Sequence, residues 1–252
     1  MSELNVHRFG PESGPTILAL HGLTGHGLRW RLLAERLPDC RVIAPDLRGH
    51  GRSTSLPPWT LETVADDVAA LIEPRRPVTV VGHSFGGMVA IHLAHRNPEL
   101  VAGLVLLDPA VGLPPEALLP IAEQTIADPG YADVEAARRD KIATAWQDVA
   151  PEILSGELAE HLIPRSDGRL GWRMHTAAVT AYWGELARDV LLPPADLTTT
   201  VVYGNQSQVT APLRVALQRD PRPKLTLREF DCDHMVLEAL PDETAAVVRS
   251  AL

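Results

Sequence analysis

The segment that most constrains the fold is a predicted strand, tight turn and helix between residues 77 and 96. The β-branched run Val78–Val81 is typical of a buried strand, and the apolar residues later in the segment favour a helix. Between them lies the motif G-x-S-x-G, centred on Ser84. A serine at the apex of so sharp a turn adopts a strained backbone conformation with its hydroxyl exposed. Strand and helix can pass each other only if the outer motif positions carry no bulk, which explains Gly82 and Gly86.

A serine in this position needs further groups before it can react. The helix begins at Ser84, so its unpaired amides and the positive end of its dipole face an oxyanion formed at the reacting carbon. A free serine hydroxyl is nevertheless a poor nucleophile at neutral pH. It requires an adjacent base, and an acid that holds this base in one tautomer. A histidine and an acid must therefore come from other parts of the chain.

The order of apolar runs predicts the architecture. Patterns typical of buried strands lie at residues 16–20, 41–45, 78–81, 101–107, 200–204 and 225–230, after an edge-like strand at 4–9. Helices are predicted at residues 28–37, 61–71 (capped by Thr60), 88–96 and 236–252. Strands that alternate with helices every 20 to 30 residues indicate βαβ units. The predicted fold class is α/β, with a mostly parallel central sheet flanked by helices.

The alternation stops between residues 111 and 194. Four amphipathic helical patterns occur there, at residues 115–127, 133–149, 151–162 and 174–192, and no strand is predicted. A helical insertion between two late strands would lie over the carboxyl ends of the sheet, where open α/β sheets bind ligands. Residues 1–110 and 195–252 are therefore predicted to form the core domain and residues 111–194 a lid. Trp30, Trp172 and Trp183 are candidate substrate contacts, although aromatic residues at helical spacing more often form the core of a lid.

Composition excludes several classes of partner. The 252-residue chain carries a net charge of −9, and its Lys/Arg clusters do not exceed two residues, which argues against nucleic acid. Two cysteines are too few for a disulfide framework. The N-terminal residues lack the pattern of a signal peptide, and apolar runs stay shorter than a membrane span. We therefore expect a soluble, cytoplasmic protein that acts on a small-molecule substrate, with no membrane partner, cofactor or metal site.

Several motifs, taken together, resemble the α/β-hydrolase superfamily over nearly the whole chain. They are His21-Gly22, the stretch Asp46–Ser53, the turn around Ser84, the strand that ends at Asp108, and Asp233-His234 before the last helix. The resemblance implies a lid-bearing, esterase-like enzyme whose catalytic residues follow the order nucleophile, acid, histidine. Ser84 matches the nucleophile and His234 the base.

The acid departs from the commonest pattern. Relatives usually carry an aspartate a few residues past the strand that ends here at Gly204, but residues 197–219 contain no Asp or Glu. The resemblance to some superfamily members, including certain haloalkane dehalogenases, favours Asp108, at the end of the preceding strand. The alternative is a serine–histidine pair in which an amide or hydroxyl near Ser207 orients His234.

The resemblance also implies an oxyanion hole and a reaction. The hole would use the backbone amides of Leu23 and Phe85. The expected enzyme is a serine hydrolase that cleaves a small to medium ester, thioester or lactone through an acyl-enzyme. A carbon–carbon bond hydrolase, a cofactor-free haloperoxidase or a lyase would share the triad, and a non-catalytic binder of small ligands is the alternative of another class. Serine at position 84 argues against epoxide hydrolase and dehalogenase chemistry, because those enzymes use an aspartate nucleophile.

Overall fold

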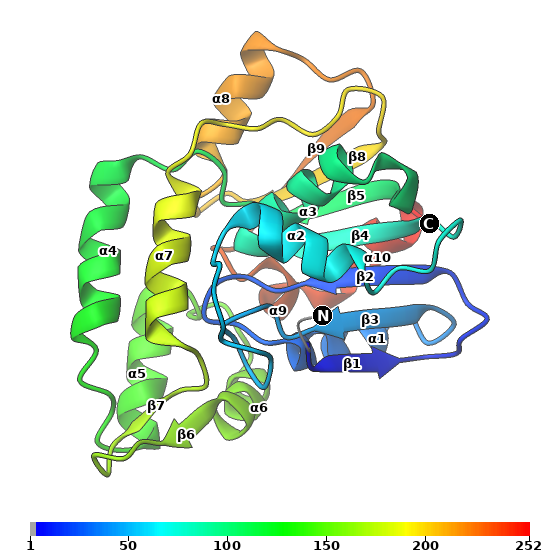
Figure 1. Cartoon of the computed structure of the whole chain (residues 1–252). Coiled ribbons are helices and arrows are strands. Elements are labelled where there is room, and N and C mark those ends of the chain that lie inside the picture. Colours follow the sequence, from blue (N-terminus) through cyan, green and yellow to red (C-terminus); the bar gives the residue numbers. More distant parts are fainter. Residues whose placement is uncertain (1–3) are drawn as a thin grey trace.

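A computed structural model describes residues 4–252, so residues 1–3 of the N-terminal stretch, in which no signal peptide was predicted, lie outside the described part. Its centre is a seven-stranded sheet of order β1-β3-β2-β4-β5-β8-β9 (Figure 1). The strands are β1 (Val6–Phe9), β2 (Thr16–Leu20), β3 (Arg41–Pro45), β4 (Val78–His83), β5 (Val101–Leu107), β8 (Thr199–Gly204) and β9 (Leu225–Phe230). β1 pairs with β3 in antiparallel fashion and the other pairs are parallel. The predicted α/β class with a mostly parallel sheet is confirmed.

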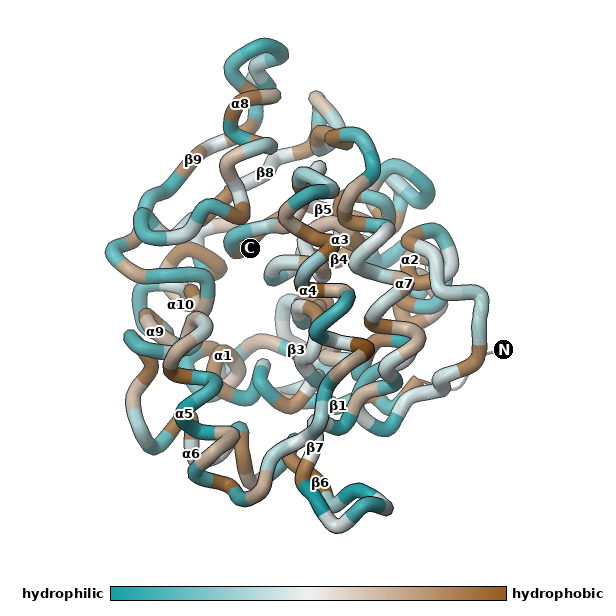
Figure 2. The backbone as a smooth tube through the Cα atoms, turned by 90° about the vertical axis from the view of Figure 1, so that its left-hand side faces the viewer, coloured by the Kyte–Doolittle hydropathy of each residue, from teal (hydrophilic) through white to brown (hydrophobic). Residues whose placement is uncertain are grey.

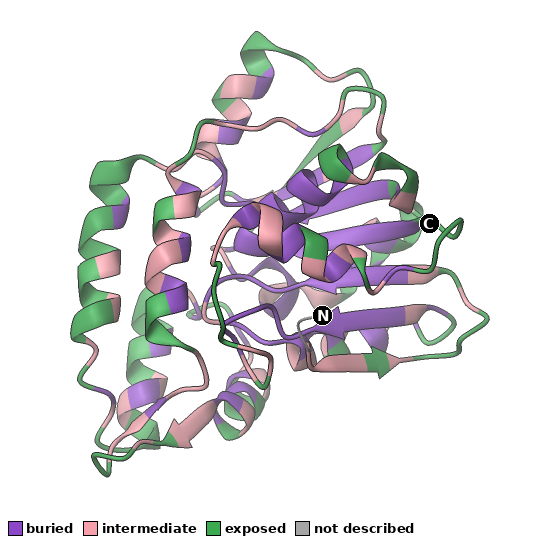
Figure 3. Ribbon diagram, viewed as in Figure 1, coloured by how far each residue is buried: buried purple, intermediate pink, exposed green. Residues whose placement is uncertain are grey.

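Helices cover both faces of this sheet. α2 (Leu61–Ala69) and α3 (Phe85–Arg96) pack on one face, and α1 (Arg31–Ala34), α9 (Val236–Ala239) and α10 (Pro241–Ser250) pack on the other. Successive strand residues alternate between the two cores: Leu18 belongs to the α2–α3 side and Ala19 to the opposite side. The inner strands are buried along most of their length (Figure 3). Their near-continuous apolar sequences follow from this two-sided burial.

The insertion lies beyond the carboxyl ends of the parallel strands (Figure 1). It contains α4 (Pro115–Ala127), α5 (Val134–Thr144), α6 (Pro151–His161), β6 (Leu162–Pro164), β7 (Leu170–Trp172) and α7 (Thr176–Leu186). All four predicted helices are present, but α5 ends at Thr144 rather than at residue 149, and α7 ends at Leu186 rather than at residue 192. The prediction that the insertion has no strand is wrong, because β6 and β7 form an antiparallel hairpin. Each of these strands has three residues, too few to produce a visible alternation of polar and apolar positions.

Helices of the core also differ from the predictions. The helix predicted at residues 28–37 is a 3₁₀ turn, η1 (Gly27–Trp30), followed by the four-residue α1. The last helix is divided into α9 and α10 at Pro241, whose ring disfavours a helical conformation at the preceding residue. The sequence analysis missed α8 (Ala211–Arg219), although the proline in its first turn is a start signal. The predicted cap at Thr60 is confirmed, because its hydroxyl accepts from the amide of Thr63 at 3.3 Å.

The crossing of β4 and α3 leaves no room for side chains at the two motif glycines. Ser84, between strand and helix, has φ 53° and ψ −118°, a strained conformation for a residue with a side chain. A Cβ at Gly82 would lie 2.4 Å from the carbonyl oxygen of Gly86. A Cβ at Gly86 would lie 2.2 Å from the carbonyl oxygen of Leu20. The steric argument made from the motif is therefore confirmed.

Within residues 4–252, no helix combines the length and the apolar character that a bilayer crossing requires.

Cys40 and Cys232 are free and buried. Burial, reinforced by the charge of Asp108, raises the pKa of Cys232 to about 12, so this thiol stays protonated at neutral pH.

Gly86→Ala should destabilise the fold severely, because the new methyl group would have to displace the backbone of β2. We expect the free energy of unfolding in urea to fall by about 3 kcal/mol or more. Gly184→Ala is the matched control: Gly184 lies within α7 and its added Cβ meets no atom within 4 Å. There the free energy of unfolding should rise by up to about 1 kcal/mol, because alanine is the better helix former. Similar losses in both variants would contradict the close-crossing explanation.

Candidate active site

The backbone of Ser84 is held by the segment that follows β5. Its amide donates to the carbonyl of Leu107 at 3.0 Å, and its carbonyl accepts from the amide of Ala110 at 3.1 Å. Its side chain, by contrast, makes no capping hydrogen bond to α3. The serine is thus fixed through its main chain, while its hydroxyl is not used by the helix that it begins.

Asp108, directly after β5, is the meeting point of three segments. Its carboxylate is fully buried and accepts from His234 Nδ1 at 2.6 Å. The hydroxyls of Ser207 and Thr210 donate to its two oxygens at 2.5 and 2.6 Å. Because a carboxylate only accepts, the proton of the His234 contact belongs to Nδ1, which leaves Nε2 as the acceptor nitrogen of the neutral ring. The structure therefore brings Asp108 to His234, as the resemblance implied.

Asp108 remains ionised although it is buried. Burial alone would raise the pKa of this carboxyl, but the hydrogen bond and charge of His234, followed by the hydroxyls of Ser207 and Thr210, lower it below its ordinary value. An ionised carboxylate can stabilise an imidazolium, which a neutral amide or hydroxyl cannot do. The electrostatic requirement for an acid beside His234 is met by this residue.

The loop after β8, where relatives usually carry the acid, supplies hydroxyl groups that bind the carboxylate of Asp108. Ser207 directs its hydroxyl to Asp108, and the side-chain amide of Asn205 donates to Asp231 at 3.0 Å. These contacts do not support the alternative in which either residue orients His234. The role of Thr210 was missed, and the only signal in the sequence was a hydroxyl residue close to the site of the absent aspartate.

His234 is anchored to the turn that carries Ser84. Nε2 of His83, the residue before Ser84, donates to the carbonyl of His234 at 2.9 Å, and the two imidazole centroids are 4.7 Å apart. Burial, followed by the charge of His234, lowers the pKa of His83 to about 3. His83 is therefore neutral and adds no second positive charge when His234 takes up a proton.

The two residues predicted to supply the oxyanion amides, Leu23 and Phe85, belong to segments next to Ser84. Leu23 belongs to a tight turn, residues 22–25, closed by a hydrogen bond from the amide of Gly25 to the carbonyl of Gly22 at 3.0 Å. A Cβ at Gly22 would lie 3.0 Å from Ser84 Cβ, so the turn packs directly on the serine. Phe85 is the first residue of α3, and its amide has no carbonyl to bind within the helix. We call residues 22–25 the oxyanion turn.

The core fixes the start of the oxyanion turn through His21. The amide of Leu47 donates to His21 Nε2 at 2.9 Å, so Nδ1 carries the ring proton and donates to the carbonyl of Gly22 at 2.8 Å. Burial, with the neighbouring His50, holds the pKa of His21 well below its ordinary value, so the ring is neutral. The histidine of the His21-Gly22 motif is thus a structural support rather than a base.

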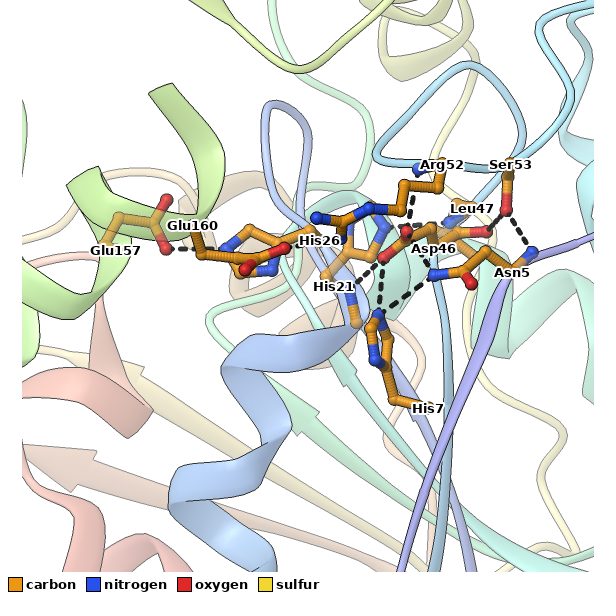
Figure 4. A network of polar contacts seen from close by, with 11 residues as sticks. Asn5, His7, His21, His26, Asp46, Leu47, Arg52, Ser53, Glu157 and Glu160 are labelled. Atoms are coloured by element: carbon orange, nitrogen blue, oxygen red, sulfur yellow. Dashed lines mark hydrogen bonds and ion pairs between the residues drawn. The ribbon is translucent and has the colours of Figure 1, made fainter. Parts of the chain in front are cut away.

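Asp46 fixes the backbone just after the oxyanion turn (Figure 4). Its carboxylate accepts from the amide of Gly27 at 2.7 Å, from the amide of Arg52 at 2.9 Å and from the side chain of Asn5 at 2.9 Å. Burial alone would raise the pKa of Asp46, but His7 and these backbone amides hold it far below its usual range. One charged group of the Asp46–Ser53 motif therefore joins the first strand, the motif loop and the segment that follows the oxyanion turn.

A large apolar pocket opens beside His234. Its volume is about 1040 Å³, and it is bordered by α4, α8 and the loops next to them. Figure 2, which faces α4, shows α8 above that helix. The lining is mostly apolar and includes Leu113, Leu118, Ile121, Val190, Val209 and Val215, with Ser207 and His234 also at its wall. A pocket of this size and character suits an apolar group larger than acetyl.

None of the three candidate tryptophans lines this pocket. Trp30 is 1% exposed and belongs to the core beneath α1 and α9, a place that does not fit the predicted contact with substrate. The indole N–H of Trp172 donates to the Tyr131 hydroxyl at 3.2 Å, and that of Trp183 donates to Thr125 at 3.1 Å. Both indoles make their hydrogen bonds inside the insertion, in agreement with the expectation that such aromatic residues form its core.

Asp108→Asn should keep the shape of the acid but lose its charge and favour the wrong imidazole tautomer. We expect a loss in kcat of at least about a hundredfold in steady-state ester hydrolysis. Thr210→Val, which removes one hydroxyl from the same carboxylate, should cost less, about threefold to tenfold. A loss of less than about tenfold in Asp108→Asn would show that the carboxylate is not required to orient His234.

Comparisons with known proteins agree with this geometry. A family model described as the alpha/beta hydrolase family matches residues 17–247. Lipase LipV of Mycobacterium tuberculosis strain H37Rv is 45% identical over 255 residues, which span 99% of this chain and 98% of the relative. The crystal structure of E-2-(acetamidomethylene)succinate hydrolase is similar with a TM-score of 0.84 and 25% identity, covering 99% of this chain and 94% of that one. An enol-lactonase from Burkholderia xenovorans LB400 shares the fold, with a TM-score of 0.80, 19% identity, and coverage of 99% and 96%. The chain therefore belongs to the α/β-hydrolase family, and it is a hydrolase similar to carboxylic ester hydrolases.

Proposed function

We propose that the protein is a serine ester hydrolase that works through an acyl-enzyme, with Ser84, Asp108 and His234 as its triad. The observation that supports this proposal most strongly is the 2.6 Å contact between Asp108 and His234 Nδ1. It leaves Nε2 of a histidine, tied to the serine turn through His83, as a base without its own proton.

The proposed reaction has two halves. His234 Nε2 takes the proton of Ser84 as the hydroxyl oxygen attacks the ester carbonyl, and the amides of Leu23 and Phe85 stabilise the resulting oxyanion. When the tetrahedral intermediate collapses, the carbon–oxygen bond to the alcohol breaks and His234 returns the proton to the departing alcohol. A water molecule, deprotonated by His234, then attacks the acyl-enzyme, and the acid is released as Ser84 recovers its proton.

The substrate is proposed to be an ester with an apolar acyl group of medium length. The pocket of about 1040 Å³ supports this choice, because it begins at His234 and its wall is mostly aliphatic. The relative named a lipase points in the same direction. The insertion, residues 111–194, would act as the lid, since α4 supplies one wall of the pocket.

Ser84→Ala should abolish turnover without loss of stability, because the residue is small and its side chain makes no capping contact. A fluorophosphonate should add to the wild-type protein once per chain, at the peptide that contains Ser84, and should not add to the variant. On p-nitrophenyl esters, kcat/KM of the wild-type protein should rise from acetyl to octanoyl as more methylenes enter the pocket. Wild-type activity in a pure preparation of Ser84→Ala would refute the assignment. A profile that falls with acyl length would refute the substrate class alone.

A further inference from the structure

Three side chains from distant parts of the chain, those of His26, Arg29 and Lys141, meet at one buried carboxylate, Glu157 on α6. Its side chain is 3% exposed. Arg29 donates to both oxygens, from Nη2 at 2.5 Å and from Nε at 3.0 Å. His26 Nε2 donates at 2.9 Å, a contact that Figure 4 draws, and Lys141 Nζ lies 3.5 Å away. Glu157 therefore joins the insertion to residues 26 and 29 of the core.

Those two core residues adjoin the oxyanion turn. His26 follows the turn directly and is the N-cap of η1. The guanidinium of Arg29 packs on the turn: Nη2 lies 3.5 Å from the carbonyl oxygen of Thr24, and a Cβ at Gly25 would meet Nη1 at 2.9 Å. Thr24 has φ 60°, a left-handed conformation that a residue with a β-branched side chain adopts only under constraint from its surroundings.

The charge on Glu157 is stabilised by its partners. Burial alone would raise the pKa of this carboxyl, but Arg29, Lys141 and the hydrogen bond from His26 hold it well below its ordinary value. Burial raises the pKa of a second carboxyl nearby, Glu238, and burial keeps the pKa of His161, whose ring centroid lies 4.7 Å from that of His26, well below its ordinary value. Glu157 is thus the anion that holds the Arg29 fork in place.

The oxyanion turn is consequently held from two sides. From the core, His21 binds the carbonyl of Gly22 at its start and Asp46 binds the amide of Gly27, two residues past its end. Within residues 4–252, Glu157 is the only acid that forms an ion pair with Arg29, and it belongs to the insertion. Two hydrogen bonds in a fork fix the plane of a guanidinium as well as its position. An ion pair that served only to attach the insertion to the core would not need to fix the orientation of the Arg29 guanidinium against the oxyanion turn.

We propose that Glu157 is a positioning residue for the oxyanion hole. Through Arg29 and His26 it sets the oxyanion turn so that the amide of Leu23 points at the oxyanion formed on Ser84. The inference rests on the proposed function, because the oxyanion exists only if Ser84 attacks a carbonyl. The hole is then complete only when α6 is seated on the core.

The test is Glu157→Gln, which keeps the size of the side chain but removes the charge that holds Arg29. We expect kcat on a p-nitrophenyl ester to fall by about tenfold or more while KM changes by less than about twofold, because a misplaced donor weakens the transition state more than the bound substrate. Glu160→Gln is the matched control on the same helix. Its partner, Arg52, is 47% exposed, and neither side chain touches the oxyanion turn, so kcat and KM should both stay within about twofold of wild type.

A second measurement separates positioning from general weakening of the structure. A trifluoromethyl ketone with a medium alkyl chain adds reversibly to an active-site serine and places an alkoxide in the oxyanion hole. Its inhibition constant should rise in Glu157→Gln by the factor by which kcat/KM falls, whereas inhibition by the matching methyl ketone, which depends on the acyl pocket, should stay unchanged. Circular dichroism during heating identifies a variant that does not fold. In that case Arg29→Lys, which keeps the positive charge and loses the fork, is measured in the same way with the same expectation.

The proposal is overturned if a folded Glu157→Gln keeps kcat and the inhibition constant of the trifluoromethyl ketone within about twofold of wild type. It is equally overturned if kcat falls while that inhibition constant does not change, because the loss would then bypass the oxyanion. Failure of the underlying function looks different. A wild-type protein that does not bind the trifluoromethyl ketone more tightly than the methyl ketone would remove the premise, and the inference with it.

Discussion

The hydrogen bond between Asp108 and His234 is the interaction on which the rest of the site depends. It joins residues that are 126 positions apart, and it places a charge in a fully buried position. Such a charge is stable only if its oxygens are fully bonded, and the hydroxyls of Ser207 and Thr210 complete the bonding. The ends of β5 and β8 and the loop after β9 are therefore held in register by one carboxylate.

A second set of constraints holds the backbone around Ser84. The lack of a side chain at Gly86 lets α3 pack closely against the carbonyl of Leu20, and the lack of one at Gly22 lets the oxyanion turn pack on Ser84. From the core, Asp46 binds Gly27 just past that turn, and from the insertion Glu157 holds Arg29 against it. The strained conformation at Ser84 persists because neighbours on both sides over-determine it.

Local patterns were enough to predict the sheet and the serine turn, because each rests on residues that are close in sequence. The assignment of His234 as the base came from the resemblance. The choice of Asp108 came from resemblance and from the absence of an acid in residues 197–219. The features that were missed depend on contacts between distant segments: Thr210 binds Asp108 across 102 positions, and Glu157 binds Arg29 across 128. Trp30 was a candidate for substrate contact for the same reason. Its neighbours in the sequence do not reveal that it packs in the core and does not line the pocket.

The measurement that tests the central claim most directly is proton NMR of the His234 imidazole in ¹⁵N-labelled protein. A proton held between Nδ1 and a buried carboxylate should give a strongly downfield resonance that exchanges slowly with water. We predict this resonance in the wild-type protein and in Ser207→Ala, and its loss in Asp108→Asn and in His234→Gln. Its absence from the wild-type protein, or its persistence in Asp108→Asn, would contradict the assignment of Asp108 as the partner of His234.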